Sequence, residues 1–551
     1  MAIKPPMMSL PIRTATTGFY KGFSRDVTIT AKVLIGALVI WAVAFPEAAG
    51  GVLNTFNAFI LENFGAWYIY AVAIFVLVCL LLAAWPTAGR LKLGQADDVP
   101  EFSNFSWFSM MFGAGIGVGM LTWAVAEPMY HWNNNPEVIK GLATGASADN
   151  IRNAYKWSFL HWGLGAWACY AIAGLSLAFF SYRRSLPLTI RSSLTPLFGK
   201  ALSGPLGHVI DVVAVVATIL GVAQTLGFGV EQFVAGLSRI GIGDWLINAE
   251  GTASPTGIIV AIVVIMSAST LSALSGVGKG IKWLSNINMV LSILLLAFFL
   301  IFGASFFGLQ ALVLGVFDYL VALPDMTFRV WGSDGTETGD ALAGWQGAWS
   351  VFYWAWWVAF APFVGLFLAR ISKGRTIREF VLGAMIVPSL MCFVWFTWAG
   401  GTAIDLELNG GAGGLIASAP DGDKIFAMVQ YMLSPFLGWA MAVMIVILLM
   451  TYLVTSADSA VLIVNTINAA GDEGPKARPH IIFWGVALGA VVAALLLVGG
   501  LKAIQTAMVI GALPFSLVMV LMCIALIKAI YRDGMREKQG VATLANEAPA
   551  T

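Results

Sequence analysis

Charged residues are scarce in this 551-residue chain, where Asp, Glu, Lys and Arg together make up only 11%. A soluble globular domain carries about 25%, so the composition excludes an ordinary soluble protein. Histidine and cysteine are also scarce, with four of each, and no nucleic-acid signature is present. The cysteines lie scattered within apolar runs, and the histidines are equally scattered along the chain. Neither set has the spacing of metal ligands. We therefore expect buried packing thiols, no zinc or haem centre, no cofactor and no enzyme activity.

Long apolar runs fill most of the chain, and hydrophobic residues make up 59% of it. A helix needs about 20 such residues to cross a bilayer. The sequence predicts an all-α integral membrane protein with twelve transmembrane helices, the first of them a retained span and not a signal peptide. The predicted spans are residues 29–47, 66–84, 104–125, 152–180, 207–237, 256–274, 281–303, 345–369, 375–401, 438–468, 479–499 and 505–531.

Basic residues indicate how the chain sits in the membrane. Most of the 30 Lys and Arg residues lie before the first span, after the last one, or in alternate loops between them. Loops rich in Lys and Arg stay in the cytoplasm. We therefore expect a multi-pass protein of a bacterial-type plasma (inner) membrane with both termini in the cytoplasm, which an even number of spans also requires.

Two spans carry residues that weaken a helix. The third span has four glycines at every second position between Gly113 and Gly119. Each glycine costs about 1 kcal/mol relative to alanine in a helix, and close helix packing through small residues favours spacings of four instead. We predict an unwound segment whose free carbonyls bind a cation or water. A second interruption is predicted at Pro362 and Gly365 in the eighth span.

The two interruptions are separated along the sequence by nearly the same number of residues as Thr218 in the fifth span and Thr455 in the tenth. Two five-span halves follow, and an odd number of spans inverts the second half relative to the first, as in many transporters. The expected domains are residues 1–103 (cytoplasmic N-terminus and two peripheral helices), 104–303 (first repeat), 304–344 (interfacial helix and external loop), 345–531 (second repeat) and 532–551 (short cytoplasmic tail).

Aromatic residues gather in the fourth and eighth spans. At about 100° per residue, Trp162, Trp167 and Tyr170 share one half of the fourth helix. In the eighth span Trp354 and Trp357 share a face, whereas Trp356 points roughly the other way. A quaternary cation cannot donate a hydrogen bond, and each desolvated π-face holds it with about 2 kcal/mol. The pattern indicates a carrier for a methylated onium compound, with core packing or an interface belt as the alternative.

Polar residues inside the spans are few. Thr455 and Ser456 offer two adjacent hydroxyls that can bind a sodium ion, although a helical hydroxyl often only bonds the carbonyl one turn back. Asp458 is a costly intramembrane acid that is either functional or structurally paired. We interpret Glu127, at the end of the third span, as a structural partner near the outer edge. Charges this sparse argue against the continuous polar pore of a channel.

Five motifs together resemble the betaine/carnitine/choline transporter family, over a stretch from about residue 29 to residue 531. They are the glycine-rich third span with Ala126-Glu127-Pro128, the Trp162, Trp167 and Tyr170 pattern, Tyr353 to Trp357 with Pro362-Phe363-Val364-Gly365, Arg370 to Thr376, and Thr455 to Ser459. The resemblance implies two N-terminal helices outside a five-plus-five core, alternating access and commonly a homotrimer.

The resemblance also implies site residues. It implies an aromatic box of Trp162, Trp167, Tyr170 and Trp357. It implies a sodium site made by backbone oxygens of Gly113 and Ile116 with Tyr452, Thr455 and Ser456. The full set that we expect to bind substrate is Trp162, Trp167, Tyr170, Trp354, Trp357, Phe360, Gly115, Gly117 and Gly119. A second ion site, present in some members, would fall on Thr218 and Val222, but the valine side chain cannot ligate an ion.

We expect secondary active uptake of a quaternary ammonium or sulfonium zwitterion, of the glycine betaine or dimethylsulfoniopropionate type, by sodium symport. Choline carriers of the family often have an acid where this chain has Gly119, which favours a zwitterion. The alternative is a proton-coupled choline transporter or a carnitine-type exchanger. Exchangers place a basic side chain where sodium would bind, and the fifth and tenth spans contain none. The short tail favours simple nutrient or osmolyte uptake over osmotic sensing.

Overall fold

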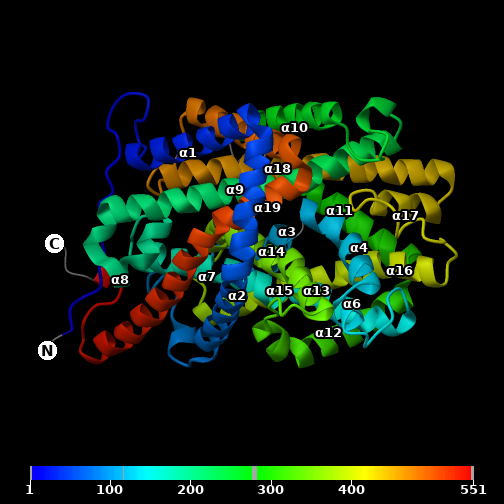
Figure 1. Cartoon of the computed structure of the whole chain (residues 1–551). Coiled ribbons are helices and arrows are strands. Elements are labelled where there is room, and N and C mark those ends of the chain that lie inside the picture. The colour runs from blue at the N-terminus through cyan, green and yellow to red at the C-terminus, as the bar shows by residue number, and fades with distance from the viewer. Residues whose placement is uncertain (1–2, 116, 276–281, 548–551) are drawn as a thin grey trace.

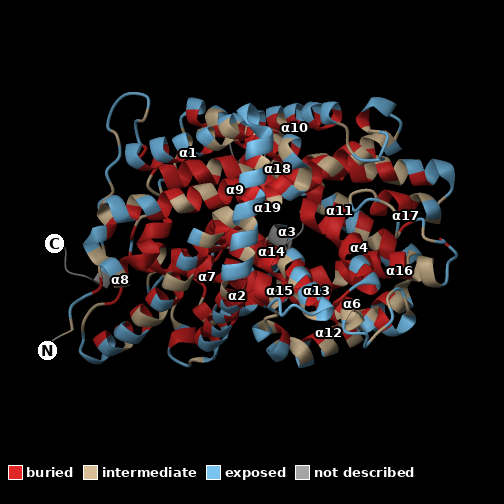
Figure 2. Ribbon diagram, viewed as in Figure 1, coloured by how far each residue is buried: buried red, intermediate tan, exposed pale blue. Residues whose placement is uncertain are grey.

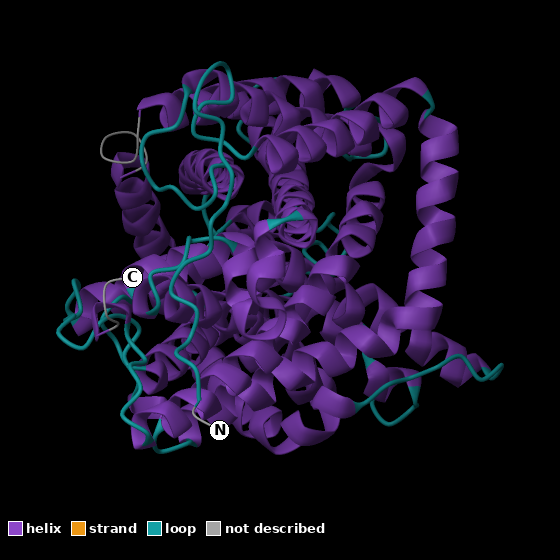
Figure 3. Ribbon diagram, turned by 90° about the vertical axis from the view of Figure 1, so that its left-hand side faces the viewer, coloured by secondary structure: helices purple, strands orange, loops and turns teal. Residues whose placement is uncertain are grey.

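The computed structural model describes residues 3–115, 117–275 and 282–547. Over these ranges the chain forms helices and no strand, as Figure 3 shows, and extended pairing is limited to three isolated bridges. Figures 1 and 3 place both ends of the chain on the same side of the helical bundle. Buried residues fill the interior (Figure 2). Many of the exposed side chains are large and apolar. This apolar exterior suits a lipid environment.

Eleven helices in the described ranges are long and apolar enough to cross a membrane. Their bounds follow the predicted spans in most places. Three of the eleven combine two of the elements each, namely α6 with α7, α13 with α14 and α15 with α16. The elements are α1 (Arg25–Ala44), α2 (Pro46–Ala84), α6 (Ile151–Trp162), α7 (Leu164–Ala178), α9 (Pro205–Arg239), α10 (Pro255–Ser275), α11 (Lys282–Phe302), α12 (Ser305–Phe328), α13 (Glu337–Gln346), α14 (Phe352–Ile371), α15 (Ile377–Trp395), α16 (Gly401–Leu408), α18 (Pro435–Asn468) and α19 (Arg478–Lys538).

The predicted count of twelve spans is not confirmed, for three reasons. The third span is divided into α3 (Asn104–Gly115) and α4 (Val118–Asn133), which are each too short to qualify alone. The predicted interfacial helix is α12, which does qualify by length and hydropathy. The last two predicted spans are joined in α19, where Gly499 and Gly500 have non-helical dihedral angles. The inverted repeat and the domain bounds stay predictions.

The predicted interruption of the third span is present and short. α3 continues through Gly113 to Gly115, and α4 begins at Val118. Gly117 between them is extended, with φ −156° and ψ −169°. Ile116 lies outside the described residues. The chain therefore leaves the helix over a shorter stretch than the glycine spacing predicts.

The predicted interruption at Pro362 and Gly365 is wrong, because α14 is continuous across both residues. Gly365 instead permits a close crossing with α7. A Cβ atom on Gly365 would lie 2.6 Å from the Cβ of Ala173 and 2.9 Å from the backbone nitrogen of Gly174. Small residues let helices approach closely within a membrane, and neighbouring helices allow a proline inside such a span. The motif serves packing and not unwinding.

A buried ion pair fixes the start of α9. Nε of Arg191 donates to Asp211 at 2.7 Å, and both side chains have 0% exposure. Removing one partner of a buried pair costs about 3–5 kcal/mol because the other charge stays buried without compensation. We expect Asp211→Ala to lower the midpoint of thermal unfolding in detergent. Asp318→Ala is the control, because Asp318 pairs with the more exposed Arg152; equal destabilisation by both variants would contradict the argument.

Candidate functional site

Aromatic rings from α6, α7 and α14 meet in the interior of the bundle, where α7 packs against α14 and Figure 1 places α14 near the middle. The ring centroids of Trp162 and Trp357 are 5.0 Å apart with an interplanar angle of 73°. Tyr170 lies 6.0 Å from Trp357 and 5.3 Å from Trp167. All four side chains are at most 6% exposed. The structure thus brings the four residues of the expected aromatic box into one continuous cluster.

A break at Gly163 orients these rings, whereas the sequence predicts one continuous helix over residues 152–180. Gly163 separates α6 from α7 with φ −94° and ψ −141°. A Cβ atom there would lie 2.4 Å from the carbonyl oxygen of Phe159 and 2.7 Å from the hydroxyl of Tyr319, so no side chain fits. The freed carbonyl of Trp162 accepts the indole N–H of Trp167 at 3.2 Å. The break therefore links two members of the cluster directly.

Trp356 also belongs to this cluster, which differs from the helical-wheel prediction that it points away. Its ring stacks on that of Trp357 at 4.9 Å and lies 6.3 Å from Trp162. Its indole N–H donates to Thr225 of α9 at 3.2 Å. A Cβ atom on Gly119 would lie 3.0 Å from Trp356 and 3.4 Å from Trp162. A wheel places only the Cβ direction, whereas a large indole leans along the helix to reach its neighbours.

Two other predicted substrate residues lie at the margin of the cluster. Phe360 is 6.4 Å from Tyr170 and 5.0 Å from Phe363, ring centroid to ring centroid. Trp354 packs against the backbone of Gly165, where an added Cβ would lie 2.9 Å from the indole. The substrate-binding roles of both residues stay predictions, as do those of Gly115, Gly117 and Gly119.

Beside the rings lies a buried polar cluster centred on Glu127 of α4. Its Oε2 accepts the indole N–H of Trp162 at 2.6 Å and also the hydroxyl of Tyr353. Its Oε1 lies 2.8 Å from Nδ1 of His161 and 3.4 Å from Nε2 of His131. All these polar side chains are buried, so Glu127 connects α4, α6 and α14 through the candidate site. Glu127 is a structural partner, as predicted, but it is fully buried and its partners include a member of the aromatic box, which the predicted place near the outer edge did not anticipate.

Neither histidine was predicted as a site residue, because the four histidines lie scattered along the sequence. Glu127 and His131 are one helical turn apart, which is the signal that was available. The ligand atoms of Glu127, His131 and His161 lie within 4.8 Å of one another, a set that is able to hold a metal ion. Both carboxylate oxygens already accept hydrogen bonds, and Nε2 of His161 lies 3.1 Å from the hydroxyl of Ser350. We therefore interpret the set as a hydrogen-bond network that orients the rings.

Two of the predicted sodium ligands on α18, Tyr452 and Thr455, face α11. Thr455 accepts the side-chain amide of Asn288 at 3.0 Å and donates to the carbonyl of Thr451 at 2.9 Å. The hydroxyl of Tyr452 lies 2.6 Å from that of Ser292. These side chains offer neutral oxygen ligands, which suit a monovalent ion that must be released. Because Ile116 is outside the described residues, the complete ligand set stays a prediction.

Asp458 on α18 is paired with hydroxyl groups. Its carboxylate accepts the hydroxyl of Ser272 on α10 at 2.6 Å and that of Ser459 at 3.0 Å. These contacts satisfy a carboxylate that is otherwise costly inside a membrane. They support the structurally paired interpretation, since Asp458 joins α10 to α18.

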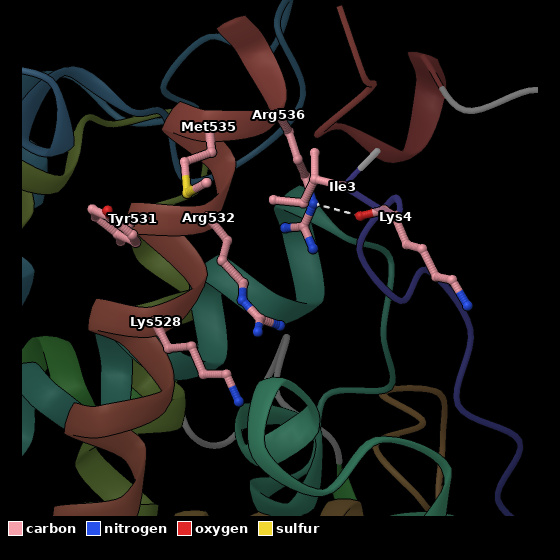
Figure 4. Close-up of a pocket in the computed structure, with 7 residues that line it drawn as sticks. All are labelled: Ile3, Lys4, Lys528, Tyr531, Arg532, Met535 and Arg536. Carbon is pink, nitrogen blue, oxygen red and sulfur yellow. Dashed lines mark hydrogen bonds between the residues drawn. The ribbon is translucent and has the colours of Figure 1, made fainter. Parts of the chain in front are cut away.

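The surface hollow in Figure 4 lies elsewhere, between the N-terminal segment and the end of α19. Nε of Arg536 donates to the carbonyl of Lys4 at 2.8 Å and ties the two segments together. The hollow is lined by Ile3, Lys4, Lys528, Tyr531, Arg532, Met535 and Arg536. A basic lining repels an onium cation and suits the cytoplasmic side of a membrane protein.

Comparison with known proteins identifies the family. The family profile described as "BCCT, betaine/carnitine/choline family transporter" matches residues 26–535, which is nearly the whole chain. The chain belongs to the betaine/carnitine/choline transporter family. It is therefore a multi-pass membrane transporter and not an enzyme.

Three relatives resemble the transporter over most of their own length. The probable glycine betaine transporter of Desulfitobacterium hafniense is 38% identical over 501 residues, covering 90% of this chain and 95% of the relative. The glycine betaine transporter OpuD of Bacillus subtilis is 36% identical over 504 residues, covering 91% and 93%. The osmo-independent choline transporter BetT1 of Acinetobacter baylyi is 36% identical over 495 residues, covering 89% and 90%.

Proposed function

We propose that the transporter takes up a zwitterionic onium compound, of the glycine betaine or dimethylsulfoniopropionate type, by sodium symport with alternating access. The observation that carries this proposal is the buried cluster of Trp162, Trp167, Tyr170 and Trp357. Methylated onium groups bind to π-faces because they offer no hydrogen bond and carry a diffuse positive charge. Relatives described as glycine betaine transporters support the same substrate class.

Choline is the second candidate, since one relative is described as a choline transporter. Position 119 favours the zwitterion. Gly119 lies against Trp162 and Trp356, and this position lacks the acid that choline carriers of the family often have there. An acid there would repel the carboxylate of a zwitterion and attract choline.

Uptake by the purified transporter in proteoliposomes tests this function. We expect labelled glycine betaine or dimethylsulfoniopropionate to accumulate when an inward sodium gradient is present, and choline and carnitine to accumulate much less. Vesicles without protein give the background. Choline uptake driven by a proton gradient, or carnitine uptake that requires internal carnitine, would contradict the proposal and support one of the alternatives.

Sodium coupling through one principal site gives a separate prediction. Thr455→Ala combined with Ser456→Ala removes two oxygen ligands, and we expect the sodium concentration for half-maximal uptake to rise about tenfold. Thr451→Ala is the control, since among the residues that the structure describes its hydroxyl bonds to carbonyls of its own helix. Because Val222 lies where a second site would need a ligand, the Hill coefficient for sodium should be about 1. Full uptake in sodium-free buffer would refute sodium coupling.

Further features of the proposal concern the assembly and the membrane. We propose a homotrimer in the bacterial inner membrane, with both termini in the cytoplasm and residues 104–303 and 345–531 as inverted repeats. The position of both chain ends on one side of the bundle supports the placement of the termini. The basic hollow beside α19 supports it as well, because basic residues gather on the cytoplasmic side.

A further inference from the structure

We propose that Glu127 selects for the positive charge of the substrate from behind the indole of Trp162. This inference rests on the proposed function, since it requires that the aromatic cluster holds an onium group. Oε2 of Glu127 lies 2.6 Å from Nε1 of Trp162. An indole nitrogen is a donor only, so the carboxylate accepts this bond along the ring edge. The same ring lies 5.0 Å from that of Trp357, at an interplanar angle of 73°.

Charge selection by Glu127 requires its ionised form, and no strong cation lies beside it in the described part of the chain. Within the described part of the chain, the ion-pair partners found for its carboxylate are His131 and His161, and no lysine or arginine. All three side chains have 0% exposure, so water does not screen them. A buried carboxylate whose ion-pair partners are histidines is less well compensated than one paired with a lysine or an arginine. An onium group on the other side of the indole would supply the missing positive charge.

A carboxylate at this distance adds to what the rings provide. Aromatic faces attract a cation weakly through their quadrupoles, and they also bind neutral methyl groups by simple burial. A full negative charge acts over a longer distance, and it acts strongly where the dielectric constant is low. The hydrogen bond from the indole N–H to the carboxylate is charge-assisted, and it holds the ring close to the anion. The anion therefore distinguishes a trimethylammonium group from an uncharged group of the same shape.

The competing explanation is that Glu127 only positions the rings. Its Oε2 also accepts the hydroxyl of Tyr353, so one carboxylate fixes side chains of α6 and α14 together. Loss of these contacts would disturb the shape of the site for any ligand. A test must therefore compare two ligands of equal shape and different charge.

Glycine betaine and tert-butylacetate are such a pair, because tert-butylacetate has a carbon atom in place of the ammonium nitrogen. We expect Glu127→Gln to weaken binding of glycine betaine about tenfold and to leave tert-butylacetate nearly unchanged. Tyr353→Phe keeps the charge and removes one hydrogen bond, so it should affect both ligands to the same smaller extent. Binding is measured with the full-length protein in detergent, by displacement of labelled glycine betaine.

A second variant offsets the negative charge of Glu127 by a substitution at a neighbouring residue. His131→Lys places a cation one turn along α4, beside Oε1, and should lower the preference for glycine betaine as Glu127→Gln does. His131→Gln is its neutral control and should keep the preference. Equal losses for both ligands in Glu127→Gln, or an unchanged preference in His131→Lys, would overturn the charge-selecting role. Wild-type protein that binds no onium compound would instead refute the proposed function, and this inference with it.

Discussion

Trp162→Ala and Trp357→Ala are each expected to weaken binding of glycine betaine by about tenfold or more, because each removes one desolvated π-face from the onium group. The two rings lie 5.0 Å apart, and both are buried. Trp167→Ala should have a smaller effect of a few-fold, since its ring contacts Tyr170 at the edge of the cluster. Titration of the intrinsic tryptophan fluorescence of the purified variants measures these affinities.

Trp439→Ala is the matched control for these substitutions. Trp439 is 46% exposed and far from the cluster in the sequence, and its indole N–H donates to the carbonyl of Ile240. Its removal should leave substrate affinity unchanged. The stacking of Trp356 on Trp357 adds an expectation, because Trp356→Ala should lower affinity as well as stability. Unchanged affinity in the Trp162, Trp167 and Trp357 variants would refute the aromatic box.

Gly119→Asp is expected to change substrate choice, raising the choline-to-betaine affinity ratio by about tenfold or more. An added Cβ would lie 3.0 Å from Trp356 and 3.4 Å from Trp162, so the new carboxylate would sit among the rings. It would attract the choline cation and repel the carboxylate of a zwitterion. Competition of unlabelled choline and glycine betaine against one labelled ligand gives the ratio.

The control for this prediction is Gly119→Asn, which has nearly the same size as aspartate and no charge. Both variants require Trp356 to move by a few tenths of an ångström to accept the new Cβ, so any steric loss should be shared. Only the charge should alter the ratio of the two affinities. Equal losses of choline and glycine betaine in both variants would mean that position 119 controls backbone shape alone.

The sequence by itself determined the class of protein and four members of the aromatic cluster, but not the membership of Trp356. Scarce charge and long apolar runs determine an all-α membrane chain, because backbone groups in lipid must be satisfied within each helix. Trp162, Trp167 and Tyr170 were found from their spacing even though a break at Gly163 lies among them. The grouping of these rings was predictable because large π-faces are rarely gathered inside a span for any purpose except packing or cation binding.

Only the tertiary structure decided what the ambiguous residues do. Glycine and proline permit both unwinding and close packing, and the neighbouring helix selects between them. Gly365 packs on Ala173 and Gly174, so α14 stays helical, whereas Gly163 meets Phe159 and Tyr319 and ends α6.

The polar network was also beyond the sequence, because its members come from three separate helices. His161 and Tyr353 reach Glu127 only after α4, α6 and α14 have packed together. Hydropathy records how each segment partitions into lipid and carries no information about which buried polar groups become partners. Their pairing follows from the cost of burying each one alone, which only the packed bundle can offset.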